Sequence, residues 1–402
     1  MPATIAPAGI GAHLPQGALC WISACSAESA IFREGLAGIS RPDLTFTGIF
    51  VPGLNRPGHL LDTGGRVTTF FMLPDLAASE RVEFLPLCYR DIRAYLAANP
   101  PQAALVMVAP PDAEGRCSFG PVTDFIADLW QRIPVLIGHI NPLLPPTRGT
   151  PGIPLDRFAA IIEMEQELPQ SDPGLDEACA RIAVHAASVI PDGATIQAGV
   201  GRAPEAVLRA LGGKRDLAIH SGLIGDSTLF LLRSGALRAA DPVVAGVAIG
   251  TRALYDAVSG PEFSFRPPSH IHDIATLAAI PRLVTVNSAI EVDLDGQAHA
   301  EETPAGYISG PGGASDFAAG ARGQSGLRII VLPSTAGRNG AVSRIVRPQD
   351  AAGPVSLGRF DTDLVITEHG IADLRGKSHE GRRAALRAVA DPRHIAALAA
   401  DS

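Results

Sequence analysis

The segment AALVMVAPPD, residues 103–112, decides the fold class of this chain. Its apolar residues continue without alternation and end at two prolines, which is the pattern of a strand buried on both faces of a sheet. A turn-rich loop follows. We then predict a helix over residues 123–132 and a second apolar strand, PVLIGHIN, over residues 134–141. This strand–helix–strand order predicts a parallel sheet with covering helices.

The second half of the chain repeats the same order. We predict a helix over residues 175–189, the strand ATIQAG over 194–199, a helix that has Pro204 in its first turn, and the strand DLAIHS over 216–221. Proline suits a first helical turn because its missing N–H has no partner there anyway. The turn-forming residues PQSDPG, 169–174, separate the two halves. We therefore expect two α/β domains, residues 1–172 and 173–402.

Composition describes a compact globular protein and excludes two classes of partner. The 402 residues are 46% hydrophobic and 18% charged, with a net charge of −8. Basic residues do not cluster with aromatic ones, so we expect no nucleic-acid partner. A membrane span needs roughly 18–20 apolar residues. The most apolar stretch, residues 133–144, is interrupted by Pro134, His139, Asn141 and Pro142, so we expect no membrane association.

The cysteines and histidines give no sign of a disulfide frame or a metal site. Five cysteines are scattered without C-x-x-C pairs, and an odd count fits reduced cytosolic thiols. Nothing near Met1 resembles a signal peptide, so the predicted location is cytoplasmic. The residues SHIHD contain His270 and His272, but Pro267 and Pro268 before them favour an exposed loop. We propose no metal.

The stretch TVNSAIEVDLDG, residues 285–296, alternates like a strand. Glu291 shares one face with Ala289 and Asp293, and Asp295-Gly296 predicts a two-residue hairpin turn. Two interpretations of Glu291 stand side by side at this point: a solvated face, or a catalytic carboxylate. We interpret Asp293 and Asp295 as structural, with Asp295 belonging to the turn.

Three glycine-rich motifs are ambiguous when each is taken alone. GVGRAP, 199–204, does not favour a nicotinamide cofactor, because Pro204 stands where a third glycine is expected and the next strand ends in His220-Ser221. SGPGGASDF, 309–317, could bring bare backbone to an anion or form a flexible surface loop. TEHGIADLRGK, 367–377, ends a strand in a polar loop. A lone histidine such as His369 is more often a hydrogen-bonded structural residue than a catalytic base.

Together the motifs resemble one family. NSAIEVDLDGQ, ISGPGGASDFAAGA, IIVLPSTA with VSRIV, and TEHGIADLRGKS occur in this order, preceded by APPDAEGRCSFG, IQAGVGRAP, LAIHS and IGTRALYD. They are similar to the acetyl-CoA hydrolase/transferase family of class I CoA-transferases, which includes 4-hydroxybutyrate, butyrate, propionate and succinate CoA-transferases. The resemblance spans roughly residues 100–395 and is strongest from Val284 onward. It implies two similar open α/β domains with the active site between them.

The resemblance also implies roles for individual residues. Glu291 corresponds to the catalytic glutamate, which attacks an acyl-CoA thioester and then forms a glutamyl-CoA thioester. Oxyanion or CoA contacts fall on Gly250, Thr251, Gly310, Gly312, Gly313 and Gly370. Arg375 and Lys377 become partners for CoA phosphates, or belong to a solvated loop. The resemblance implies that CoA, as acyl-CoA, and a small carboxylic acid are the substrates and that no cofactor is permanently bound. It also implies that the protein assembles as a homodimer or a larger homo-oligomer.

Four positions depart from the family pattern: Arg202 and Gly222, and also Ala341 and Phe360. Glycine is usual at 202, an acidic residue at 222, Asn or Lys at 341, and Asn at 360. We expect these changes to surround the acyl and acceptor pockets.

The resemblance predicts that the function is CoA transfer between a short acyl-CoA and a carboxylate. Acyl-CoA hydrolysis by the same glutamate remains an alternative, as does a catalytically silent CoA-binding protein.

Overall fold

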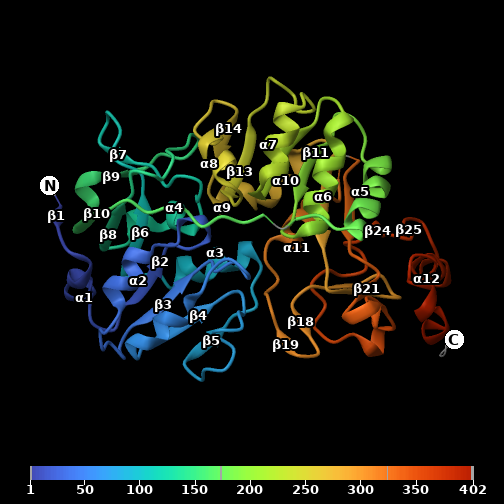
Figure 1. Ribbon diagram of the computed structural model, residues 1–402, viewed down its shortest axis with the longest axis horizontal. Coiled ribbons are helices and arrows are strands. Elements are labelled where there is room, and N and C mark those ends of the chain that lie inside the picture. Colours follow the sequence, from blue (N-terminus) through green and yellow to red (C-terminus); the bar gives the residue numbers. More distant parts are fainter. Residues whose placement is uncertain (1, 173, 324, 400–402) are drawn as a thin grey trace. The chain divides into compact units, whose positions relative to one another are not determined.

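The chain forms two compact units, each a mixture of helices and strands (Figure 1). The computed structural model describes residues 2–172, 174–323 and 325–399. One unit comprises the residues up to 171 together with 243–271, and the other comprises 172–242 together with the residues from 272 onward. Pro173, where we place the start of the second domain, lies outside the described residues, and the domain limits stay a prediction.

The first unit is built on a sheet of eight parallel strands. In spatial order these are β1 (Ala3–Thr4), β10 (Ala160–Glu163), β8 (Val135–Ile140), β6 (Ala103–Val108), β2 (Leu19–Ile22), β3 (Thr45–Gly48), β4 (Arg66–Thr69) and β5 (Val82–Phe84). The apolar runs at 103–112 and 134–141 are therefore neighbouring parallel strands, as predicted.

The burial of β6 on both faces accounts for its uninterrupted apolar sequence. All six of its side chains are buried. Ala104 and Val106 pack into one hydrophobic cluster, while Ala103 and Leu105 pack into another. Successive side chains of a strand point to opposite faces, so both faces of this sheet are covered.

Helices and short strands complete the first unit. The predicted helix over 123–132 is α4 (Phe125–Leu129) followed by a 3₁₀ turn (Trp130–Arg132). The other elements are α1 (Ile10–His13), α2 (Ala30–Leu36), α3 (Tyr89–Ala98), α8 (Arg252–Ala257), α9 (Pro268–Ile271), β7 (Arg116–Cys117) with β9 (Ile153–Pro154), and β13 (Val243–Ala248) with β14 (Phe263–Phe265).

Six strands of the second unit lie side by side in one sheet. In spatial order these are β12 (Ala218–Ile224), β11 (Thr195–Ala198), β15 (Leu283–Ser288), β20 (Leu327–Val331), β24 (Leu364–Thr367) and β25 (Gly370–Asp373). All pair in parallel except β25, which is antiparallel to β24. From β11 the chain proceeds to β12 on one side, and β15, β20 and β24 follow on the other. The strand order thus reverses between β11 and β15.

Helices surround this second sheet. Asp176 caps the amino-terminal end of helix α5 (Glu177–Val189), because its side chain accepts a hydrogen bond from the Cys179 N–H at 2.8 Å. The predicted helices at 175–189 and at Pro204 are both present, as α5 and α6 (Arg202–Ala210). The others are α7 (Asp226–Arg233), α10 (Ile274–Ala279), α11 (Ala314–Gly320), α12 (His379–Ala388) and α13 (Ile395–Leu398).

Short strands follow β15 and carry the next part of the chain outward. β16 (Glu291–Asp293) pairs with β17 (Ala298–His299) and with β23 (Ile345–Val346). Two further hairpins are β18 (Glu302–Thr303) with β19 (Gly306–Tyr307), and β21 (Thr335–Ala336) with β22 (Val342–Ser343).

The turn between β16 and β17 differs from the predicted two-residue turn. The Asp293 N–H donates to the Gln297 carbonyl at 3.0 Å, and Gly296 adopts a φ of +85°. The loop therefore contains three residues, with glycine in the left-handed conformation that such loops require. Asp293 enforces the longer loop, because its Oδ1 accepts the N–H groups of Asp295 and Gln297, each at 3.0 Å.

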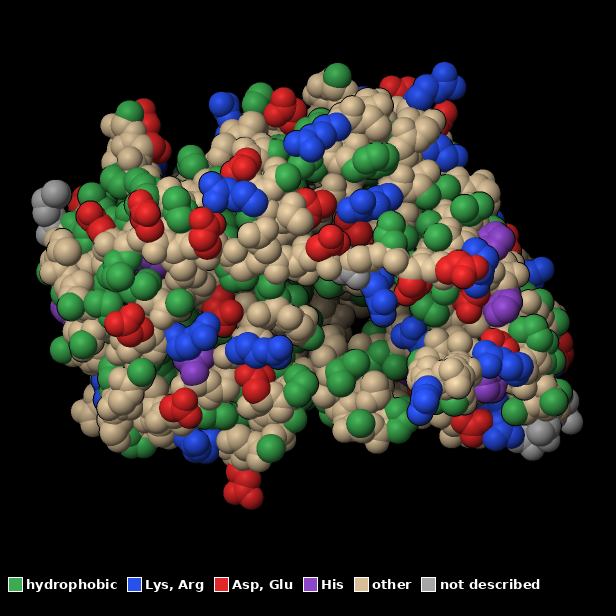
Figure 2. All heavy atoms as spheres, in the orientation of Figure 1, with side chains coloured by type: hydrophobic (Ala, Val, Ile, Leu, Met, Phe, Trp, Pro, Cys, Tyr) green, Lys and Arg blue, Asp and Glu red, His purple; other side chains and the backbone are tan. Residues whose placement is uncertain are grey.

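Two further features concern the length of the helices and the distribution of charge on the surface. Among the described residues, none of the helices is both long and apolar enough to cross a membrane. On the face drawn in Figure 2, Lys and Arg side chains are interspersed with Asp and Glu rather than gathered into one basic stripe.

Candidate active site

A cavity of about 240 Å³ lies in the second unit, at the carboxyl-terminal edge of its sheet. Part of its wall follows the ends of β11, β15 and β20, where the strand order reverses. Open α/β sheets bind ligands at this kind of crevice. The lining residues are Asp176, Cys179, Arg202, Ala203, Ser288, Ala289, Ile290, Ala300, Val331, Leu332, Pro333 and Arg344.

Glu291 begins β16 directly after two residues that line this cavity. It is only 8% exposed, and Asp293 on the same face is fully buried. The interpretation of this face as solvated is therefore wrong. The face is covered because residues 352–357 run beside the hairpin, and the Ala352 N–H donates to Glu291 Oε1 at 2.5 Å. Glu291 Oε1 thus has a backbone donor supplied by a segment 61 positions further along the chain.

Arg344 braces the backbone that leads into Glu291. Its Nε donates to the Ile290 carbonyl at 2.5 Å and its Nη2 to the Ala289 carbonyl at 2.8 Å. Burial lowers the pKa of the guanidinium, while the carboxylates of Glu291 and Glu368 act in the opposite direction. An arginine remains charged throughout the accessible pH range. The side chain thus fixes the bend before Glu291 and places positive charge beside the cavity.

The other two acids of the hairpin have structural partners, as predicted. Asp293 accepts hydrogen bonds from the Gln297 side chain at 2.7 Å and lies 3.4 Å from His299 Nε2. Burial raises the pKa of Asp293, but these bonds outweigh it and hold that pKa below its usual range. Asp295 lies in the turn and accepts from Arg383 Nη2 at 3.2 Å.

The glycine loop before α11 rests on a buried histidine. A Cβ at Gly313 would lie 2.2 Å from His272 Cε1, and one at Gly222 would lie 3.2 Å from His272 Nε2. The expectation of an exposed loop at SHIHD is wrong. His270 belongs to α9, and His272 is only 5% exposed because it fills the space between Gly222, near the carboxyl end of β12, and the glycine loop. Burial, reinforced by repulsion from His220, lowers the pKa of His272 to about 3.

Gly310, Gly312 and Gly313 therefore share the carboxyl-terminal edge of the sheet with Glu291. Gly222 lies on β12 and Glu291 follows β15, and these two strands are about 10 Å apart because only β11 lies between them. Gly312 adopts a φ of +61°, which favours glycine. The loop thus brings close-packed backbone to the same edge as the carboxylate.

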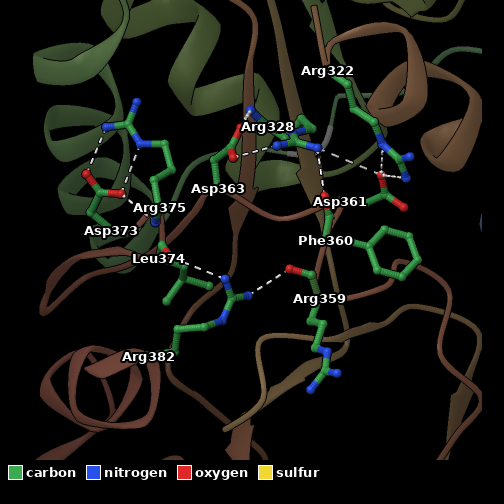
Figure 3. Close-up of polar contacts among 10 residues, drawn as sticks. All are labelled: Arg322, Arg328, Arg359, Phe360, Asp361, Asp363, Asp373, Leu374, Arg375 and Arg382. Atoms are coloured by element: carbon green, nitrogen blue, oxygen red, sulfur yellow. Dashed lines mark hydrogen bonds and ion pairs between the residues drawn. The ribbon is translucent and has the colours of Figure 1, made fainter. Parts of the chain in front are cut away.

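The motif at 367–377 is divided between the two edges of the sheet. Gly370 pairs with Thr367 at the carboxyl end of β24, whereas Asp373 pairs with Leu364 at its amino end. Arg375 lies two residues after Asp373, and its side chain donates two hydrogen bonds to that carboxylate, at 3.0 and 2.8 Å (Figure 3). The structure therefore places Gly370 at the edge that carries the cavity and Arg375 at the opposite one. Lys377 follows Arg375 and is exposed.

Gly250 and Thr251 belong to the first unit, where they follow β13 and precede α8. The Gly250 carbonyl accepts from the Ser171 N–H at 3.1 Å, and the Gly250 N–H lies 3.3 Å from the Tyr255 hydroxyl. Their surroundings are thus well defined within that unit.

The four departures from the family pattern do not all surround the cavity. Arg202 lines it, and Gly222 accommodates His272. Ala341 is exposed, in the turn that joins β21 to β22. Phe360 lies at the amino-terminal edge, 67% exposed, with Arg322 stacked 5.1 Å above its ring (Figure 3). Phe360 does not line this cavity, because the strand it precedes enters the sheet from the other edge, and its place at an acyl pocket stays a prediction.

Three residues near Glu291 were not singled out from the sequence: Ala352, His299 and Arg344. Ala352 acts through its backbone, which carries no side-chain signal. His299 lies opposite Glu291 in the antiparallel ladder because the loop contains three residues, whereas the predicted two-residue turn would have placed Ala300 there. Arg344 stands within the motif VSRIV but has no pattern of its own. Within the described part of the chain, no three His, Cys, Asp or Glu side chains converge as metal ligands.

Comparisons with known proteins identify the family of this chain. Residues 250–402 match the model of the acetyl-CoA hydrolase/transferase C-terminal domain. A 4-hydroxybutyrate coenzyme A transferase of Clostridium kluyveri is 33% identical over 330 residues, which are 79% of this chain and 77% of that protein. A succinyl-CoA:acetate/propanoyl-CoA:succinate CoA transferase of Fasciola hepatica is 32% identical over 78% of this chain and 67% of its own.

A solved structure extends the likeness to nearly the whole chain. The crystal structure of 4-hydroxybutyrate CoA-transferase from Porphyromonas gingivalis superposes with a TM-score of 0.81 and 28% identity, over 99% of this chain and 96% of that one. The predicted mixed α/β fold with large parallel sheets is confirmed. The sequence motifs, the fold and the relatives together assign this chain to the acetyl-CoA hydrolase/transferase family.

Proposed function

We propose that this protein transfers CoA between a short-chain acyl-CoA and a carboxylic acid, with Glu291 as the nucleophile. A glutamate is ionised at neutral pH, so it needs no neighbouring base to act as one. One carboxylate oxygen attacks the thioester carbonyl carbon, and the carbon–sulfur bond breaks. The products of this step are a mixed anhydride on Glu291 and the free CoA thiolate.

The second step returns the thiolate to the enzyme. It attacks the glutamyl carbonyl carbon, and the bond from that carbon to the bridging oxygen breaks. The first acid leaves as a carboxylate, and a glutamyl-CoA thioester remains. An incoming acid then reverses both steps. Each attack passes through a tetrahedral oxyanion that requires hydrogen-bond donors.

One observation carries the proposal: Glu291 is a buried carboxylate beside the cavity at the reversal point of the sheet, with one oxygen hydrogen-bonded and its backbone braced by Arg344. A carboxylate held in one orientation avoids the cost of ordering it during the reaction. The relatives named above are CoA-transferases, and this supports the same reaction class.

The glycine positions belong to the proposal as oxyanion donors or CoA contacts. Gly310, Gly312 and Gly313, together with Gly370, are supported by their place at the cavity edge of the sheet. For Gly250 and Thr251 the support is the family resemblance. The same is true of Arg375 and Lys377 as partners for CoA phosphates, and the ion pair of Arg375 with Asp373 competes with that role.

Hydrolysis is the second candidate, because the matched family model covers hydrolases as well as transferases. The two reactions share the covalent intermediate and differ only in whether water or an acid resolves it. Access of water to the closed site decides between them. We further propose a cytoplasmic location and a homodimeric or larger assembly, which cell fractionation and light scattering test.

Trapping of the intermediate tests the proposed function. The protein is incubated with acetyl-CoA and treated with borohydride, which reduces a glutamyl thioester, and the modified residue is located by peptide mass mapping. We expect the modification on Glu291, loss of both modification and turnover in Glu291→Gln, and normal behaviour in the matched exposed variant Glu114→Gln. Equal activity of Glu291→Gln and wild type rules out the covalent route. Formation of succinyl-CoA after addition of succinate, compared with release of free CoA, ranks transfer against hydrolysis.

A further inference from the structure

Residues 352–357 run beside the β16–β17 hairpin in a fixed register. The Ala298 N–H donates to the Leu357 carbonyl at 3.0 Å, and the Leu357 N–H donates back to the Ala298 carbonyl at 3.1 Å. This reciprocal pair is a β-bridge, so the end of the segment is aligned with β17 as a neighbouring strand would be.

Side chains of the hairpin hold the rest of this segment. His299 Nδ1 lies 2.9 Å from the Gly353 carbonyl oxygen, and the Ser356 hydroxyl donates to Glu301 Oε1 at 2.7 Å. Gly353 packs closely, because a Cβ there would lie 2.8 Å from the Cβ of Glu302. These contacts leave little freedom to the residue that precedes Gly353.

That residue is Ala352, and its N–H makes the two oxygens of Glu291 unequal. Oε1 accepts this N–H at 2.5 Å. A donor held by contacts on its own segment is already in place when charge develops on the oxygen it faces, which is the requirement for electrostatic catalysis.

We propose, on the basis of the function proposed above, that the Ala352 amide is the oxyanion donor for the glutamyl step and that Oε2 is the attacking oxygen of Glu291. In the anhydride, Oε2 bridges to the acyl carbon and Oε1 is the glutamyl carbonyl oxygen. When the CoA thiolate attacks the glutamyl carbon, the carbonyl electron pair moves onto Oε1. The tetrahedral species then collapses, the bond from the glutamyl carbon to Oε2 breaks, and the acid leaves with Oε2.

The same donor serves both halves of the reaction. An acid attacking the glutamyl-CoA thioester again pushes negative charge onto Oε1, and the thiolate then leaves. Loss of one preorganised oxyanion donor typically lowers kcat by about 10²–10³-fold. The oxyanion on the acyl carbon forms at a different atom and requires a different donor.

The local backbone permits a precise test. Ala351 has φ −62° and ψ 129°, the extended conformation that a residue before proline adopts. Ala352→Pro therefore removes the N–H with little demand on the preceding residue. Ala352→Gly retains the N–H and is the matched control. Replacement of Ala352 by lactic acid, which turns the amide into an ester, removes the same N–H without changing the side chain and provides the result should the proline variant fail to fold.

We expect the ester and proline variants to lose about 10²–10³-fold in kcat with KM little changed, and Ala352→Gly, which retains the N–H, to lose much less than either. An ester variant with a kcat within threefold of wild type overturns the proposal. Borohydride trapping on Glu291 in the wild type keeps this result distinct from a failure of the proposed function: trapping together with an active ester variant rejects only the role of Ala352. Absence of trapping, with Glu291→Gln fully active, rejects both.

Discussion

His299 Nε2 lies 3.4 Å from Asp293 Oδ2, while its Nδ1 faces the carbonyl oxygens of Gly353 and Pro354 at 2.9 and 3.1 Å. Both ring nitrogens thus face acceptors, an arrangement that only the doubly protonated imidazolium satisfies completely. Burial lowers the pKa of His299, but these contacts outweigh it and raise the pKa above its usual value. The buried pair joins the Glu291 hairpin to the segment that carries Ala352.

The first prediction is a pH window for this pair. A raised histidine pKa contributes stability that is complete below about pH 6.5 and is lost as pH rises through the folded-state pKa. The lowered pKa of Asp293 contributes stability above about pH 3.9 that is lost as pH falls. We therefore expect His299→Gln to lower the free energy of unfolding most between about pH 4 and 6.5, and by less at pH 9. Chemical denaturation at pH 5.5 and 9 measures this difference. The control His185→Gln should show no such trend, and a constant difference for His299→Gln contradicts the assignment.

How far the sequence predicts these features depends on where each signal resides. Strand β6 is recognisable because a strand with two covered faces needs an uninterrupted apolar run. Glu291 is recognisable because its side chain and its motif are both written in the sequence. Ala352 is not, because a backbone N–H looks the same at every residue and its partner is 61 positions away. The burial of His272 was missed for a related reason: the space it fills exists only because Gly222 and Gly313 lack Cβ atoms.

The second prediction concerns that packing. Gly313→Ala places a Cβ 2.2 Å from the His272 ring, so the loop or the ring must move, at a cost of about 1–3 kcal/mol. His272→Ala removes the obstacle, and we expect the double variant to be more stable than the sum of the single changes predicts. Thermal unfolding of the four proteins measures the coupling. Gly213→Ala, where a Cβ meets no atom within 4 Å, is the matched control. Additive effects of the two substitutions contradict the contact.

The third prediction concerns Arg344 as a positioning residue. Arg344→Ala leaves the carbonyls of Ala289 and Ile290 without their donors and frees the bend before Glu291. A displacement of about 1 Å at a nucleophile can cost on the order of 10²-fold in rate. We expect kcat to fall by roughly this factor with KM changed less, and millimolar guanidinium to restore part of the rate. Steady-state kinetics with and without guanidinium measure this. A fall in thermal stability with unchanged kcat indicates a purely structural role.

The fourth prediction concerns the acid that the cavity accepts. Arg202 lines the cavity, its side chain is 59% exposed, and its ion pair with Asp176 spans 3.2 Å. Exposed pairs of this kind contribute only about 0–1 kcal/mol, so a ligand carboxylate can compete for a guanidinium that offers five donors. We expect Arg202→Met to lower kcat/KM for succinate about tenfold more than for acetate, since a hydrogen bond to a charged group contributes roughly 1.5–3 kcal/mol. Asp176→Asn, which removes the competing carboxylate, should raise the ratio of kcat/KM for succinate to kcat/KM for acetate.

The matched control is Arg215→Met, at a side chain that is 83% exposed and outside the cavity lining. Equal losses for both acids contradict a role for Arg202 in recognising a second carboxylate.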